Sequence, residues 1–250
     1  MTAMSFGRFV AAPTSATITS VARSHVGLVR IINEDRVFDC PDRGVWAVAD
    51  GMGGHAGGDL AAQAVIDRLR LLTAGEGMIR FTDMLVALGQ ANGDIRQRNE
   101  RFGAAAGTTV VAAMIQDGTA HVAWAGDSRA YRLRGGGLEL LTRDHSVVQE
   151  LVDAGLLTPD RAERHPQSHV VTRALGVDDD PRLQTVSIRL LPGDRLLLCS
   201  DGLSRSLAAG DADSEAIDRL ADRMLANALA RDGSDNVSLI LIDCRPLKSR

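Results

Sequence analysis

The stretch "TTVVAAMIQDGTAHVAWA", residues 108–125, decides the fold class of this chain. It holds two short runs rich in aliphatic residues, 108–115 and 120–125, which are typical of strands. Asp117-Gly118 between them is a strong signal for a tight hairpin turn. We therefore expect two consecutive antiparallel strands, which favours a layered α+β domain over a doubly wound parallel sheet.

The rest of the chain carries similar signals, without a regular alternation of strands and helices. Further strand-like runs are 16–22, 44–49, 130–134, 195–200 and 237–243. Segments with the helical period of apolar residues are 59–72, 84–95, 147–152 and 216–230. We predict a single domain over residues 16–245, preceded by a loose tail over 1–15.

The composition is that of an ordinary soluble protein, with 45% hydrophobic and 24% charged residues in 250. A net charge of −4 gives no basic excess, so we expect no nucleic-acid partner. The three cysteines are odd in number and form no Cys-x-x-Cys pair, which favours a reducing compartment. No signal peptide or membrane-spanning run is visible, so we expect a cytoplasmic monomer without a membrane partner.

Two of the four Asp-Gly pairs stand out from ordinary turns. Asp50-Gly51 and Asp201-Gly202 each end a nearly continuous apolar run, "VWAVA" and "LLLCS". A carboxylate at the end of a buried strand costs free energy unless a cation or hydrogen-bond donors compensate it. By contrast, Asp232-Gly233 follows the 216–230 segment, where a glycine suits a helix C-terminal cap.

Other acidic residues stand at boundaries between loops and apolar runs. They are Glu34 and Asp35 in "VRIINED", Asp127 in "WAGDSR" and Asp235 in "GSDNVS". If several of them converge, divalent cations with oxygen ligands would offset their repulsion. Spacing along the chain does not by itself show that they converge.

Eight motifs in order resemble one known family. They are "SHVGLVRIINED", "VADGMGGH", "GTTVVA", "WAGDSRAYRLR", "LTRDHS", "TRALG", "LLLCSDGL" and "GSDNVSLILI", from about residue 20 to residue 243. Together they are similar to the bacterial branch of the PPM family, the metal-dependent type 2C serine/threonine protein phosphatases. The resemblance implies a four-layer αββα sandwich, in which helices flank two antiparallel β-sheets and a metal site lies at one end.

The resemblance also implies a ligand set for two Mn²⁺ or Mg²⁺ ions. Asp50 would bridge the ions, Asp201 and Asp235 would complete the shell of one, and the Gly51 carbonyl would serve the other. Glycine at position 51 would let the backbone approach the metals closely.

Four further residues receive roles by the same resemblance. Glu34 and Asp35 would hold metal-bound waters, and Asp127 would join Asp201 around a third ion. Arg30 would grip the substrate phosphate with two hydrogen bonds and position it for in-line attack. Arg30, Asp35 and Asp50 are thus the expected catalytic residues.

The implied reaction is hydrolysis of phosphoserine or phosphothreonine in a protein by a metal-activated water, without a phosphoenzyme. The partners would be phosphorylated proteins and a bacterial Ser/Thr kinase that the phosphatase opposes. "WAGDSRAYRLR" and "VQELVDAG" are similar to phosphatases that oppose the kinase of type VI secretion systems, although general kinase antagonists share most of these features. Residues 153–180 match the variable flap beside the active site, or alternatively form a solvated surface segment.

Three rival readings remain to be tested. Gly51-x-Gly53-x-x-Ala56 satisfies a relaxed dinucleotide-binding pattern, although Asp50 would then lie beside a pyrophosphate. "CSDGLSR", residues 199–205, has the spacing of a cysteine-phosphatase loop, although a cysteine that closes an apolar strand is usually inert. A regulatory module with a phosphatase-like fold is the third, against which the retained aspartates argue.

The general acid is not assigned. Met52 stands where eukaryotic members often carry a histidine that is proposed for this role, and we do not transfer the role to His55.

Overall fold

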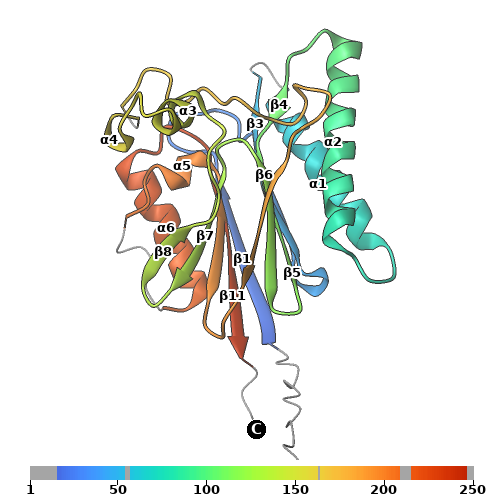
Figure 1. Cartoon of the computed structure of the whole chain (residues 1–250), viewed down its shortest axis with the longest axis vertical. Coiled ribbons are helices and arrows are strands. Elements are labelled where there is room, and N and C mark those ends of the chain that lie inside the picture. Colours follow the sequence, from blue (N-terminus) through green and yellow to red (C-terminus); the bar gives the residue numbers. More distant parts are fainter. Residues whose placement is uncertain (1–15, 54–56, 163, 209–214, 247–250) are drawn as a thin grey trace, which may run out of the picture.

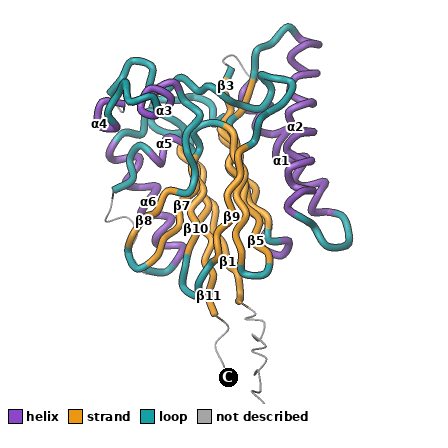
Figure 2. The backbone as a smooth tube through the Cα atoms, in the orientation of Figure 1, coloured by secondary structure: helices purple, strands orange, loops and turns teal. Residues whose placement is uncertain are grey.

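The structure is a computed structural model that describes residues 16–53, 57–162, 164–208 and 215–246. Within these ranges, two antiparallel sheets pack face to face, and helices cover both outer faces (Figure 1, Figure 2). The predicted α+β fold, a four-layer αββα sandwich, is confirmed. The expected tail over residues 1–15 lies outside the described residues.

The first sheet has the strand order β1-β11-β10-β7-β8. Its strands are β1 (Ala16–His25), β11 (Val237–Pro246), β10 (Arg195–Cys199), β7 (Arg129–Arg134) and β8 (Gly137–Leu140). Strands β1 and β11 pair along their whole length, so the first and last strands of the described chain lie side by side.

The second sheet has the strand order β2-β3-β5-β6-β9, with the short β4 beside β3. Its strands are β2 (Asp35–Cys40), β3 (Val45–Met52), β4 (Gly107–Thr108), β5 (Val110–Gln116), β6 (Thr119–Ala125) and β9 (Gln184–Arg189). The predicted hairpin joins β5 to β6: Asp117 and Gly118 both have positive φ, 50° and 69°, as a two-residue turn of this kind requires.

Helices α1 (Gly58–Ala74) and α2 (Phe81–Phe102) cover the second sheet, and α6 (Ile217–Arg231) covers the first. The short helices are α3 (Val147–Asp153), α4 (Pro159–Ala162), α5 (Asp201–Ser204) and the 3₁₀ turn η1 (Pro41–Arg43). Gly233 follows α6 with φ 65°, which bears out the predicted cap. No described helix combines the length and the apolar character needed to cross a membrane.

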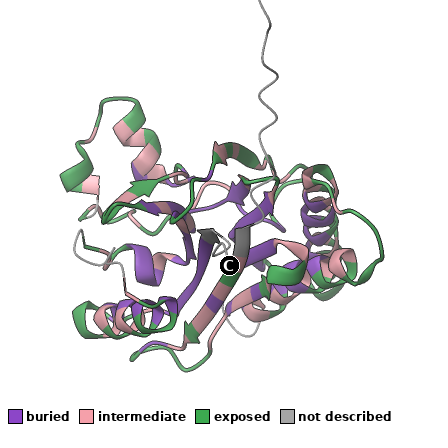
Figure 3. Ribbon diagram, turned by 90° about the horizontal axis from the view of Figure 1, so that it is seen from below, coloured by how far each residue is buried: buried purple, intermediate pink, exposed green. Residues whose placement is uncertain are grey.

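The continuous apolar runs belong to strands that are buried on both faces (Figure 3). In β3, Val45, Ala47 and Ala49 face α1 and α2, whereas Trp46 and Val48 face the other sheet. Such a strand has no polar face, so its sequence shows no alternation.

Three strands were missed because they lie at sheet edges. β2, β8 and β9 end their sheets and keep exposed or half-exposed positions. Their mixture of polar and apolar residues reflects that exposure, and it hides them from a search for apolar runs.

The predicted metal ligands fall at one end of the sandwich. Asp35 begins β2, Asp50 lies near the end of β3, Asp127 follows β6, Asp201 follows β10, and Asp235 precedes β11. Because neighbouring strands run antiparallel, all five positions lie at the same end of the sandwich, which is at the top of Figure 1.

Candidate active site

The five aspartates lie at one end of the sandwich and near enough to one another for their charges to interact. Asp35 and Asp50 are direct partners in the β2–β3 ladder. Burial raises the pKa of Asp50 well above its usual range, and the charges of Asp35, Asp201, Asp127 and Asp235 raise it further. Burial in a low-dielectric interior and nearby negative charges both disfavour the ionised carboxylate, and here they act together.

Asp35 is the most enclosed of the five, with 2% of its surface exposed. Its Oδ2 accepts a hydrogen bond of 2.8 Å from Ser200 Oγ, while its Oδ1 is buried and has no partner among the described residues. Burial raises the pKa of Asp35 to about 7, and the charges of Asp201 and Asp235 act in the same direction. The buried Oδ1 is therefore an acceptor that lacks a donor or a cation.

Asp127 and Asp201 form the other side of the group. Burial raises the pKa of Asp127 to about 7, and the charges of Asp201 and Asp144 add to the effect. Asp201 begins α5 and forms an ion pair with Arg205. Its pKa is nevertheless raised, because burial outweighs the favourable charge of Arg205.

The glycine loop packs backbone against backbone beside these carboxylates. A Cβ at Gly51 would lie 2.1 Å from the Gly58 carbonyl oxygen and 2.9 Å from that of Glu34. A Cβ at Gly58 would lie 2.6 Å from Glu34 Oε1. Glycine is thus required at both positions, and it lets the Glu34 carboxylate and the Gly51 backbone lie close together.

Asn236 holds the loop between β1 and β2 in place. Its Nδ2 donates hydrogen bonds to the carbonyl oxygens of Val26 (2.9 Å) and Ile32 (3.0 Å). Its Oδ1 accepts a hydrogen bond of 2.8 Å from the Glu34 amide. One buried side chain therefore fixes the segment that carries Arg30 and Glu34.

Arg30 stands at the open edge of the site, with 53% of its side chain exposed. Its Nη2 donates a hydrogen bond of 2.9 Å to Asp235 Oδ2. The remaining donors of the guanidinium make no hydrogen bond to the described residues. Arg30 is thus tethered to the carboxylate group while it keeps free N–H groups for an anion.

The donor set fits hard divalent cations. Every candidate ligand is an oxygen, the Oδ1 of Asp35 has no partner, and the glycine loop allows close approach. Within the described ranges, no group of three or more Asp, Glu, His or Cys side chains stands in a position to hold a metal ion. Mg²⁺ commonly uses one or two carboxylates and several waters, so an open arrangement suits it.

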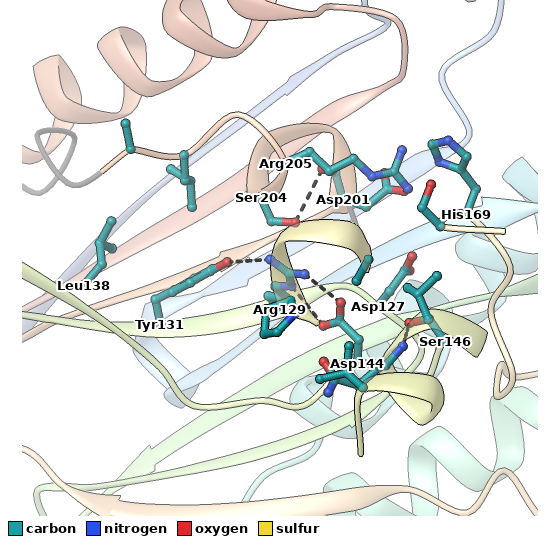
Figure 4. Close-up of a pocket in the computed structure, with 18 of the residues that line it drawn as sticks. Asp127, Arg129, Tyr131, Leu138, Asp144, Ser146, His169, Asp201, Ser204 and Arg205 are labelled. Atoms are coloured by element: carbon teal, nitrogen blue, oxygen red, sulfur yellow. Dashed lines mark hydrogen bonds and ion pairs between the residues drawn. The ribbon is translucent and has the colours of Figure 1, made fainter. Parts of the chain in front are cut away.

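A cavity of about 790 Å³ opens on the Asp127 and Asp201 side (Figure 4). It lies between α3, α4 and the segment around His169 on one side and β7, β8 and α5 on the other. Arg129 crosses its wall with hydrogen bonds of 2.9 and 2.7 Å to Asp144. Part of the predicted flap therefore forms one wall of a cavity whose lining mixes charged and apolar side chains.

Two rival readings fail on this geometry. β3 lies between antiparallel neighbours, which is incompatible with a doubly wound dinucleotide-binding sheet; His55 and Ala56 lie outside the described residues. Cys199 is fully buried in the core between the first sheet and α6. Burial raises the pKa of its thiol to about 12, and Arg205 pairs with Asp201, so no thiolate loop forms.

Sequence reasoning missed several residues that organise the site. Ser200, Asn236 and Asn33 contact the acidic segments, and Asn33 Oδ1 accepts a hydrogen bond of 3.0 Å from the Asp35 amide. Each lies inside a motif that the sequence analysis quoted. The available signal was a buried polar residue next to a candidate ligand, such as Ser200 before Asp201.

A sequence model described as protein phosphatase 2C matches residues 25–238. The chain is 38% identical over 234 residues to the serine/threonine protein phosphatase PstP of Mycobacterium tuberculosis, which covers 89% of this chain and 44% of that protein. The chain thus spans less than half the length of this mycobacterial relative.

Two solved structures are similar along nearly their whole length. One is PppA, a key regulatory component of T6SS in Pseudomonas aeruginosa: the TM-score is 0.82 and the identity 37%, over 91% of this chain and 97% of that chain. The other is the catalytic domain of serine threonine protein phosphatase PstP in complex with two manganese ions. Its TM-score is 0.82 and its identity 33%, over 92% of this chain and 100% of that chain.

Proposed function

The chain belongs to the protein phosphatase 2C family, and on that premise we propose that it is a metal-dependent protein serine/threonine phosphatase. It would hydrolyse phosphoserine and phosphothreonine in proteins. The observation that carries the proposal is the convergence of five aspartates at one end of the sandwich, where burial and mutual repulsion raise the pKa values of Asp35, Asp50, Asp127 and Asp201. Carboxylates that are so arranged and so poorly compensated are suited to divalent cations.

The residues that would hold two Mn²⁺ or Mg²⁺ ions are the ones that surround Asp50. Asp50 lies between the others, Asp201 and Asp235 would serve one ion, and the Gly51 carbonyl would serve the second. Glu34 and Asp35 would hold metal-bound waters. Asp127, whose pKa is raised in part by the charge of Asp201, would share a third ion with it.

When bound, the metal pair would lower the pKa of a water nucleophile and screen the charge that develops on phosphorus. Arg30 would receive the phosphate dianion with the N–H groups that Asp235 does not occupy, and it would orient the group for in-line attack. Asp35 Oδ1 has no hydrogen-bond donor among the described residues. It would accept a hydrogen bond from a water molecule and hold that water in a fixed orientation. Asn236 would keep Arg30 and Glu34 in position through the β1–β2 loop.

The proposed partners are phosphorylated proteins and a bacterial Ser/Thr kinase whose products this enzyme removes. Similarity to PstP and to PppA is nearly equal, 38% and 37% identity, so it favours neither general kinase antagonism nor a secretion-linked role. We assign residues 16–245 to one catalytic domain and residues 153–180 to its flap. A cytoplasmic monomer stays a prediction from composition.

Turnover of p-nitrophenyl phosphate and of a phosphothreonine peptide by the purified chain tests this function. We expect hydrolysis with Mn²⁺ or Mg²⁺ and none with EDTA. Hydrolysis that is indifferent to EDTA would instead point to a thiolate mechanism. Absence of turnover under every condition would favour a regulatory module that uses its aspartates only to bind.

A further inference from the structure

The loop that carries Arg30 exposes an unusual run of large apolar side chains. Leu28, Val29, Ile31 and Ile32 are 67%, 69%, 96% and 52% exposed, and only Arg30 interrupts them. We call these four residues the apolar rim. Single exposed apolar residues are normal on protein surfaces, but a contiguous group beside a binding site marks a contact surface for a partner.

The backbone beneath the apolar rim is held firmly. The Leu28 amide donates a hydrogen bond of 2.7 Å to the Gly233 carbonyl, and Asn236 binds the carbonyl of Ile32. Gly27 has φ 84°, and a Cβ there would lie 2.2 Å from the Asp235 carbonyl oxygen. Because the backbone is fixed at both ends, the apolar side chains are presented to solvent in a defined arrangement and have little room to fold inward.

The charge of this region limits what can bind it. Arg30 is the cation within the apolar rim, while Asp235, Glu34 and Asp201 lie close enough to influence its pKa. A ligand that places one anion on Arg30 and uncharged apolar groups beside it matches this pattern.

We propose that the apolar rim binds large aliphatic or aromatic side chains next to the phosphorylated residue, so that the preferred substrates are phosphoprotein segments with apolar flanks. The inference rests on the proposed function, because it takes Arg30 as the phosphate ligand. Apolar flanks lose water on contact with Val29 and Ile31, whereas polar flanks gain nothing there.

The selection acts on one side of the phosphorylated residue. The cavity with Arg129, Asp144 and Arg205 opens on the Asp127 and Asp201 side of the site (Figure 4). A peptide that crosses the site from the apolar rim to this cavity therefore meets an exposed apolar group at one end and a lining of mixed charged and apolar side chains at the other.

Steady-state kinetics with phosphothreonine peptides test the proposal. The peptides are identical except that the residues on the N-terminal or on the C-terminal side are Leu, Ser or Glu. We expect kcat/KM to be about 10-fold higher with Leu than with Ser or Glu on one side only. Ile31→Ser and Val29→Ser should each reduce this Leu-to-Ser ratio toward one, whereas Met78→Ser should keep it, since Met78 is 81% exposed but lies between α1 and α2.

Metal-dependent turnover of p-nitrophenyl phosphate by the wild-type chain separates this inference from the proposed function. If that turnover is present and the Leu-to-Ser ratio is near one, the inference is wrong and the proposed function stands. If the Leu-to-Ser ratio is unchanged in Ile31→Ser, the apolar rim does not bind the residues next to the phosphorylated residue, and the inference is wrong. Loss of self-association, or of binding to phosphatidylcholine vesicles, in Ile31→Ser with an unchanged ratio would assign the surface to a second copy or to a membrane and overturn the inference.

Discussion

Asp35 and Asp194 each have only 2% of their surface exposed, although Asp35 lies deeper, and their surroundings shift their pKa values in opposite directions. Asp194 precedes β10 at the far end of the sandwich, where Arg134 Nε donates a hydrogen bond of 2.6 Å and the Leu191 amide one of 2.8 Å. Burial opposes its ionisation, but these donors lower its pKa below the usual value. Asp35 has only hydroxyl partners, and its pKa is raised to about 7.

The comparison separates a buried carboxylate whose charge the chain compensates, Asp194, from one whose charge it leaves uncompensated, Asp35. The chain can satisfy a buried aspartate completely, as it does at Asp194. At the other end it brings five aspartates together, and Arg30 and Arg205 at their periphery form ion pairs with Asp235 and Asp201. The missing positive charge is what a divalent metal pair would bring.

Replacing Asp50 should give the largest effect. Asp50→Asn should reduce metal-dependent turnover by at least about 100-fold, because loss of a ligand should exceed the cost of losing a residue that only orients a ligand. The same change should raise thermal stability in EDTA at pH 7, since it removes a buried charge. Turnover and thermal unfolding of the purified variant measure both.

Asp194→Asn is the matched control. It should keep turnover and lower the free energy of unfolding by about 1–3 kcal/mol, because it weakens hydrogen bonds to a buried group. If Asp50→Asn and Asp194→Asn behaved alike in both measurements, the contrast between the two ends would be lost.

Arg30→Ala should have the next largest effect. Kinetics with a phosphothreonine peptide should show kcat/KM reduced by about 10- to 100-fold, the value of charge-assisted hydrogen bonds to the phosphate. Arg134→Ala serves as its counterpart, because it should reduce stability and leave kcat/KM unchanged. An Arg30→Ala enzyme with wild-type kcat/KM would remove this residue from the site.

The pH dependence of the free energy of unfolding should distinguish Asp35 from Asp194 without any measurement of activity. Asp35 ionises near pH 4 in the unfolded chain and near pH 7 in the fold, so the folded state holds more protons between these values. Without metal, the free energy of unfolding should therefore fall as pH rises from about 4 to 7. Asp194 has a lowered pKa, so its contribution is lost only as pH falls below about 4 and stays constant across this window.

Chemical denaturation in EDTA at several pH values would measure this slope, and Asp35→Asn should make it shallower, since Asp50, Asp127 and Asp201 contribute the rest. Mn²⁺ should stabilise the chain more at pH 7.5 than at pH 5, since it competes with protons for the carboxylates. A slope of the opposite sign across this window would contradict the raised pKa of Asp35.

Cys199→Ser should have the smallest effect on catalysis. The thiol is buried in the core, with a pKa raised to about 12, and takes no part in the proposed site. We expect kcat and KM within twofold of wild type, roughly the range of a neutral substitution. Complete loss of turnover with a retained fold would revive the thiolate mechanism.

The sequence predicted best the features that depend on burial alone. β3 and β10 were found because both of their faces are buried, and the family was identified and is confirmed because eight motifs keep their order. β2, β8 and β9 were missed because edge strands tolerate polar residues. The positions of Asp50 and Asp201 at the ends of apolar runs indicated costly carboxylates.

The convergence of those carboxylates could not be predicted from spacing. It depends on the register between β2 and β3 and on the strand order that brings these strand ends to one end of the sandwich. Ser200 and Asn236 were missed because a polar residue beside a candidate ligand has no distinct pattern until its partners are known. The apolar rim was likewise hidden inside the motif that contains Arg30.

Calorimetric titration of the metal-free chain with Mn²⁺ at pH 7 tests most directly whether the aspartates around Asp50 await cations. The account predicts at least two ions bound per wild-type chain, the same binding by Asp194→Asn, and loss of most binding in Asp50→Asn. Absence of binding to the wild-type chain, or equal binding by all three proteins, would contradict it.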